Sequence, residues 1–169
     1  MNQDKIVQIL IDRGKQLFSQ PYQKIKFTNN PEADDLLNDI KQFPHAYVLA
    51  CIMDRQIKAE RAWLIPYMIS QEIGKFYFEK LLELNMDFFR YIFIRKSLHR
   101  FNETMAENFY FAIRKIHDKY DDSASNIWND NPKSATLIRR FLEFKGVGIK
   151  IATMASNILV RGFKNYRAG

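Results

Sequence analysis

The chain has 169 residues, 47% of them hydrophobic, and a formal net charge of +7. This length and composition are sufficient for a buried core, which excludes an intrinsically disordered chain. The longest uncharged apolar run, residues 46–53, is much shorter than the ~20 residues of a transmembrane helix, and a single cysteine, Cys51, excludes an internal disulfide. We therefore expect one cytoplasmic domain over residues 1–169, monomeric and without a membrane partner, or associated with the nucleoid if the source is bacterial.

Apolar residues recur at helical spacing along nearly the whole chain. Helices are predicted over residues 4–19, from Pro31 to before Pro44, and over 44–54, 58–73, 76–84, 87–97, 102–120, 133–144 and 149–160. Asn30, Asn102 and Asn131 stand where the caps of three of these helices are expected. No alternating strand pattern with a hairpin turn competes with them. The sequence predicts an all-α protein, a compact multi-helix array in which residues 1–30 contribute to a minor lobe.

The positive charge lies in the last part of the chain. Residues 1–132 hold 18 basic and 18 acidic side chains, whereas residues 133–169 hold eight basic residues and one acidic residue, Glu143. This asymmetry is typical of a surface that binds a polyanion, although a solvated basic tail gives the same count.

A tight connection joins two of the predicted helices, in the stretch FKGVGIKIA at residues 144–152. About three residues separate the two apolar patterns, and Gly146 and Gly148 permit backbone angles that side chains would forbid. We expect Gly146 to end the first helix and Gly148 to begin the second. The unpaired N–H groups at the start of the second helix, with the positive end of its dipole, form a site suited to a phosphate.

The stretch LEFKGVGIKIATMASNIL resembles the helix-hairpin-helix motif of the DNA glycosylase superfamily that includes endonuclease III. Gly146, Val147, Gly148, Lys150 and Ala152 agree with the pattern of that motif, whereas Lys145 replaces its usual proline and Ile149 stands where a basic residue is common. The resemblance implies a DNA glycosylase-like fold with its hairpin at residues 133–160, and DNA binding by residues Lys145, Gly146, Val147, Gly148 and Ile149.

A second stretch, LACIMDRQIKAERAW at residues 49–63, is similar to the segment of endonuclease III-like proteins in which a short loop between two helices enters the DNA. Met53 falls where a DNA-inserting glutamine is often found, and Arg55 and Gln56 follow it in the loop. The resemblance implies that Met53, Arg55 and Gln56 contact DNA.

The same family implies a catalytic role for Lys150. Its lysine attacks the sugar of the damaged nucleotide and forms a Schiff base, and a position in the first turn of a helix favours the neutral amine because the dipole is positive there. The family also uses an aspartate about 18 residues further on, where this chain has Ala168. We expect this aspartate in a C-terminal extension, which could also hold an iron-sulfur cluster; no cofactor is expected in these 169 residues.

Three functions stay open at this point. The first is base-excision repair, by an N-glycosylase or apurinic/apyrimidinic-site lyase that acts on damaged or abasic duplex DNA. Its catalytic aspartate is not found at the expected position, where this chain has Ala168. The second is a non-catalytic helix-hairpin-helix module that binds DNA through its phosphates. The third is a helical interaction domain with an incidental basic tail. No metal site is expected, because His45, His99 and His117 have no spacing that places two on one helical face.

Overall fold

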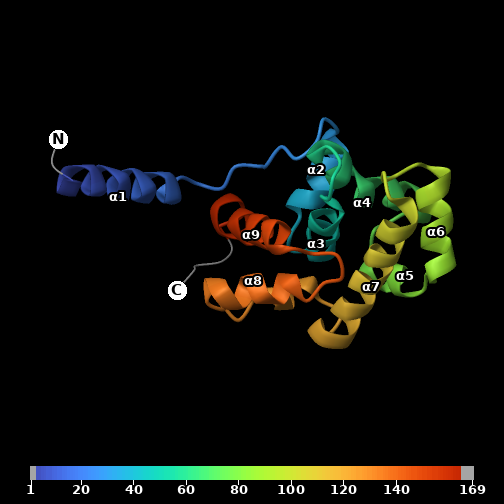
Figure 1. Ribbon diagram of the computed structural model, residues 1–169. Coiled ribbons are helices and arrows are strands. Elements are labelled where there is room, and N and C mark those ends of the chain that lie inside the picture. Colours follow the sequence, from blue (N-terminus) through green and yellow to red (C-terminus); the bar gives the residue numbers. More distant parts are fainter. Residues whose placement is uncertain (1–2, 165–169) are drawn as a thin grey trace.

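A computed structural model describes residues 3–164 and shows an array of helices joined mostly by short connections (Figure 1). The helices are α1 (Gln3–Ser19), α2 (Pro31–Asn38), α3 (Pro44–Met53), α4 (Ala59–Ile73), α5 (Phe78–Leu82), α6 (Met86–Arg95), α7 (Asn102–Tyr120), the 3-10 helix η1 (Ala124–Ile127), α8 (Ser134–Leu142), α9 (Ile149–Asn157) and the π-helix η2 (Ile158–Gly162). Residues 3–164 contain no β-strand, which confirms the all-α class. Arg167 and Ala168 lie outside the described residues.

Helix α3 forms the centre of the core. All ten of its residues are buried, because its sequence is apolar on every side and leaves no face suited to water. It packs against α2, α4, α7 and α9. The Tyr47 hydroxyl on α3 donates a hydrogen bond of 2.7 Å to the carbonyl oxygen of Ala155 on α9. The central helix is thus tied directly to the helix that follows the glycine-rich turn.

Two of the three expected helix starts differ from the prediction. The side chain of Asn30 caps α2, accepting hydrogen bonds from the N–H groups of Glu32 and Ala33 at 2.9 and 3.1 Å. The Asn102 side chain instead accepts a hydrogen bond from the His99 N–H at 2.9 Å, and α7 starts without a side-chain cap. Asn131 has a left-handed backbone with φ of 49°, and α8 begins only three residues later.

The segment between α1 and α2 is fixed to the body of the protein by two side chains of α2. Asp34 is 6% exposed and accepts hydrogen bonds from the Thr28 N–H and hydroxyl at 2.8 and 2.9 Å. Asn38 exchanges two hydrogen bonds of 2.8 Å with the backbone of Ile25. These contacts hold residues 25–28 against the body, beside α4 and η2.

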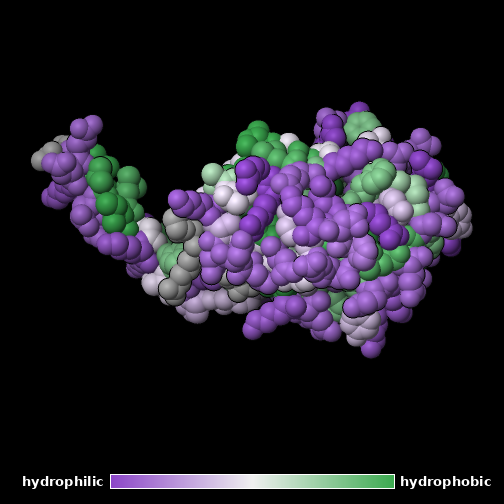
Figure 2. Space-filling view, turned by 90° about the horizontal axis from the view of Figure 1, so that it is seen from below, coloured by the Kyte–Doolittle hydropathy of each residue, from purple (hydrophilic) through white to green (hydrophobic). Residues whose placement is uncertain are grey.

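Helix α1 stands apart from the other helices (Figure 1), and none of its residues is buried. Figure 2 shows a hydrophobic stripe along it. The exposed apolar residues of α1 include Leu10, at 65% exposure. Its C-terminal end is held where the Lys164 ammonium donates a hydrogen bond of 3.2 Å to the carbonyl oxygen of Phe18. Within the described part of the chain, no helix combines the length and apolar character needed to cross a membrane.

Candidate active site

Residues 143–148 connect α8 to α9 and are called the hairpin turn here. The turn is longer than predicted, because α8 ends at Leu142 and not at Gly146. The turn is closed by two backbone hydrogen bonds between residues three apart in the chain. The N–H of Phe144 donates to the carbonyl oxygen of Phe141, and the N–H of Val147 to that of Phe144, both at 3.1 Å. Gly148 lies at the start of α9, as predicted.

The two glycines of the hairpin turn have different surroundings. Gly146 has a φ of 84°, and a Cβ built on it would lie 2.3 Å from Nδ2 of Asn108 on α7. Gly146 is therefore required for the turn to fit against α7. Gly148 has extended backbone with φ of −98°, and a Cβ there would have no neighbour within 4 Å. Its open surface leaves the first turn of α9 accessible, and α9 has no side-chain cap.

The residues that follow Gly148 reach solvent. Ile149 is 65% exposed, and Lys150 is also exposed in the first turn of α9. Val147 is half-buried against the core. Lys145 lies on the other side of the turn, where its ammonium is 3.3 Å from Glu107 and 4.6 Å from the centre of the Phe111 ring.

The connection between α3 and α4, residues 54–58, lies next to the hairpin turn and is called the α3–α4 loop. Nη1 of Arg55 is 3.6 Å from the Cβ position built on Gly146. Arg55 and Gln56 are exposed, and Gln56 has a left-handed backbone with φ of 55°. The structure thus brings together two segments that the sequence analysis singled out separately.

Met53 does not share this exposed position. Its side chain is fully buried in the last turn of α3, which does not fit a residue that enters DNA. Its carbonyl oxygen accepts a hydrogen bond of 3.1 Å from Nε2 of His99, while Nδ1 of His99 accepts one of 3.0 Å from the N–H of Phe101. His99 therefore acts as a neutral ring that holds the end of α3, and burial lowers its pKa.

Several basic side chains near the C-terminal end are paired with acidic residues from earlier in the chain. The Arg140 guanidinium makes two hydrogen bonds to Asp130, at 2.6 and 2.7 Å, and a third to the carbonyl oxygen of Ile127 at 2.8 Å. Together with the Lys145–Glu107 pair, this neutralises part of the charge that the sequence places in residues 133–169. The net charge of that segment therefore overstates what is available to a polyanion.

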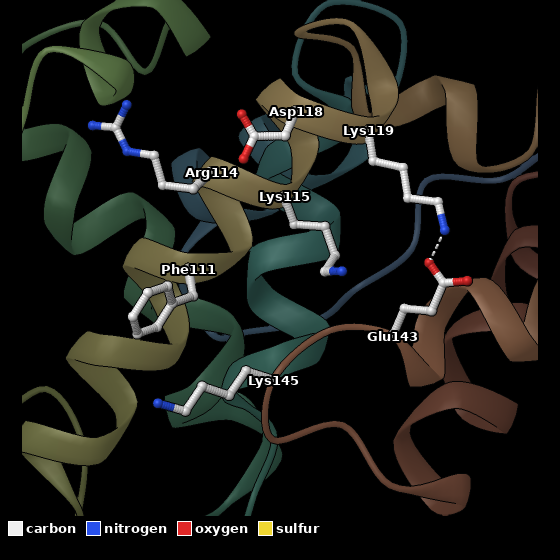
Figure 3. Close-up of a pocket in the computed structure, with 7 residues that line it drawn as sticks. All are labelled: Phe111, Arg114, Lys115, Asp118, Lys119, Glu143 and Lys145. Carbon is white, nitrogen blue, oxygen red and sulfur yellow. Dashed lines mark hydrogen bonds and ion pairs between the residues drawn. The ribbon is translucent and has the colours of Figure 1, made fainter.

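A shallow pocket beside the hairpin turn is lined by several basic side chains, including Lys145 (Figure 3). Its lining residues are Phe111, Arg114, Lys115, Asp118, Lys119, Glu143 and Lys145. Lys119 pairs with Glu143, as the dashed line in Figure 3 shows, and Arg114 donates hydrogen bonds to the carbonyl oxygens of Leu82 and Leu84 at 2.8 and 3.3 Å. Three of its four cations are thus already engaged with protein groups, which weakens it as an anion site.

A second pocket, of about 490 Å³, lies between the α3–α4 loop, α4, α9, η2 and the segment before α2, and is called the Asp54 pocket. Its lining residues are Ile25, Lys26, Phe27, Asp54, Ala59, Trp63, Met154, Asn157, Ile158, Arg161 and Gly162. The rings of Phe27 and Trp63 stack at 4.6 Å. The pocket is mainly apolar, and Asp54 is the carboxylate among its lining residues.

The Asp54 carboxyl group is half-buried in this pocket. Burial raises its pKa, whereas the indole N–H of Trp63 and the Lys150 ammonium lower it in part. Sequence reasoning named Met53, Arg55 and Gln56 in this stretch but not Asp54. No spacing rule could have found it, because the groups around it come from α4 and from α9, which is about a hundred residues later in the chain.

Groups of three or more side chains suited to a metal ion are not found among residues 3–164. Comparisons of the chain with protein-family models, with curated proteins and with solved structures gave no match.

Proposed function

We propose that this protein binds duplex DNA through the hairpin turn and the α3–α4 loop, and that Lys150 reacts with the sugar of a damaged or abasic nucleotide. The activity would be that of a base-excision N-glycosylase or apurinic/apyrimidinic-site lyase. The observation that carries the proposal is the convergence of the two segments, in which Nη1 of Arg55 lies 3.6 Å from the Cβ position built on Gly146.

The backbone around Gly148 suits contact with a phosphate. Gly148 is exposed, no neighbour would meet a side chain there within 4 Å, and the first turn of α9 has no capping side chain. Its N–H groups and the helix dipole would attract one phosphate, and the exposed Arg55 guanidinium could reach a second. Such contacts give affinity with little sequence preference.

The exposure of Lys150 supports a reactive role for this side chain. Its side chain is exposed at the start of α9, next to the surface where the phosphate would lie. A primary amine in this position can attack the aldehyde carbon of an opened abasic sugar and form a Schiff base. The amine would also reach the Asp54 pocket, because Lys150 precedes Met154 by one helical turn on the same face of α9.

Borohydride trapping on a duplex with one abasic site tests this function. The 169-residue protein should form a covalent complex with the DNA, and Lys150→Arg should form none, because a guanidinium stays protonated at the pH of the assay. The affinity of Lys150→Arg for the same duplex should change by less than about tenfold, or about 1.4 kcal/mol. Salt-dependent binding without trapping of the wild type would instead indicate a DNA-binding module without chemistry.

A further inference from the structure

Asp54 lines the pocket, and Lys150 lies one helical turn before Met154, which also lines it. Asp54 follows directly after α3, and Met154, Asn157 and Ile158 of α9 and η2 line the pocket with it. Residues 150, 154 and 158 are spaced by four, which places Lys150 on the same face of α9 as the pocket residues. Helix α3 also packs against α9, and Lys150 is close enough for its charge to lower the pKa of the Asp54 carboxyl group in part.

The Asp54 side chain is not needed to end α3. The structural task at the end of α3 is done by its backbone, since the Asp54 N–H donates to the carbonyl oxygen of Cys51 at 3.2 Å. Its side chain forms no salt bridge within 4.0 Å of a described cation, and it lies half-buried beside Trp63. Lys26 and Arg161 line the pocket with Asp54, and the charge of Lys150 lowers its pKa in part.

We propose that Asp54 is the acid-base group that serves Lys150, so that the carboxylate of this site comes from the end of α3. This inference rests on the proposed function of Lys150. It differs from the expectation drawn from the resemblance, in which the carboxylate follows the lysine by about 18 residues.

The proposed sequence of proton transfers is balanced. The Asp54 carboxylate takes one proton from the Lys150 ammonium, which leaves a free amine. The amine nitrogen attacks the sugar aldehyde carbon, the C=O π electrons move to oxygen, and one amine proton passes to that oxygen to give a carbinolamine. The protonated Asp54 then returns its proton to the hydroxyl group, which leaves as water while the nitrogen lone pair forms the C=N bond. The products are a protonated Schiff base, one water molecule and the Asp54 carboxylate.

The apolar walls of the Asp54 pocket support this exchange. A carboxyl group beside the stacked rings of Phe27 and Trp63 is less solvated than one in water, which makes its protonated form more accessible. A group that must accept a proton and later return it works best when neither state is strongly favoured at the working pH.

The experiment measures the single-turnover rate of borohydride trapping on abasic duplex for the wild type, Asp54→Asn and Asp54→Glu. Asp54→Asn should slow trapping by at least about 100-fold, the lower end of the range of general acid-base effects, while Asp54→Glu recovers part of the rate. The rate of the wild type should also fall at acidic pH as Asp54 is protonated, and Asp54→Asn should lose this part of the pH dependence.

Asp118→Asn, which removes an exposed carboxylate of the other pocket, is the matched control and should keep the wild-type rate. Asp54→Ser is a second variant without the carboxylate, for use if Asp54→Asn loses its helical circular dichroism. Wild-type rates and an unchanged acid limb in the folded variants would overturn the role of Asp54 and leave that of Lys150 intact. A wild type that is never trapped would instead overturn the proposed function.

Discussion

The backbone of Gly146 lies against the side-chain amide of Asn108, so that a Cβ on Gly146 would stand 2.3 Å from Nδ2 of Asn108. Asn108 is 2% exposed on α7, which leaves its amide little room to move away. This contact fixes the position of the hairpin turn relative to α7. It also explains why the two glycines of the turn should respond differently to substitution.

Gly146→Ala should lower the free energy of unfolding by about 1–3 kcal/mol, because the φ of 84° strains a side chain and the added methyl group meets Asn108. Gly148→Ala is the matched control and should cost less than about 1 kcal/mol, since its backbone is extended and its surroundings are open. Urea denaturation followed by circular dichroism measures both. Equal losses would mean that the Gly146–Asn108 contact is not tight in solution.

Gly148→Val should weaken binding to duplex DNA while leaving the helical circular dichroism close to that of the wild type. A branched side chain at this open position would cover the first-turn N–H groups of α9 and keep a phosphate away. Gly14→Val, in the exposed helix α1, makes the same chemical change in open surroundings and serves as the control. Unchanged binding by the Gly148 variant would place the DNA on another face.

Arg55 and Arg140 should behave differently when changed to glutamine. Arg55→Gln should weaken DNA binding and reduce the slope of log affinity against log salt by about one, as expected for one lost phosphate contact. Arg140→Gln should leave the affinity nearly unchanged but reduce stability, since its guanidinium bonds Asp130 and the Ile127 carbonyl. Filter binding at several salt concentrations, with thermal melts, distinguishes the two arginines.

Acid should destabilise the protein through His45. This ring donates a hydrogen bond of 2.7 Å from Nε2 to the carbonyl oxygen of Phe76 and is 4% exposed. Burial lowers its pKa from the ordinary value of 6.5 to about 4. Below pH 6.5 the unfolded chain therefore binds a proton that the folded chain does not, and stability should fall by about 3 kcal/mol between that pH and pH 4. Below pH 4 this contribution should change no further.

The check is a series of urea denaturations between pH 7 and pH 4. His45→Gln keeps a donor but cannot titrate, so it should lose less stability than the wild type over the same range. A wild type and variant with parallel pH profiles would assign the acid sensitivity to other groups.

The sequence predicted most helices because apolar spacing reflects which face of a helix is buried, and this information is local. Helix ends were less predictable. The Asn102 side chain does not cap α7, because it accepts a hydrogen bond from the His99 N–H. Helix α8 ends at Leu142, because backbone hydrogen bonds between residues three apart replace its expected last turn. In each case a competing local hydrogen bond determines where the helix starts or ends. The strength of that bond depends on tertiary packing, which cannot be read from the sequence.

The candidate site was predictable to a similar degree. The hairpin turn and the position of Lys150 in the first turn of α9 followed from the two glycines and the helical pattern, whereas the burial of Met53 and the pocket position of Asp54 did not. Both depend on helices distant in sequence. Met53 is held by a ring from the connection before α7, and Asp54 is faced by α9.

Tyr47 and Ala155, joined by one buried hydrogen bond between α3 and α9, are 108 residues apart in the chain. We expect a contact that closes so long a stretch to form late in folding, because the loop-closure entropy must be lost before the contact adds stability. Asp54 follows Tyr47 by seven residues and Lys150 precedes Ala155 by five, so we expect the two groups to come near each other only when this contact forms. During synthesis the carboxylate leaves the ribosome long before the lysine, so the proposed pair can form only after the last helices have been made.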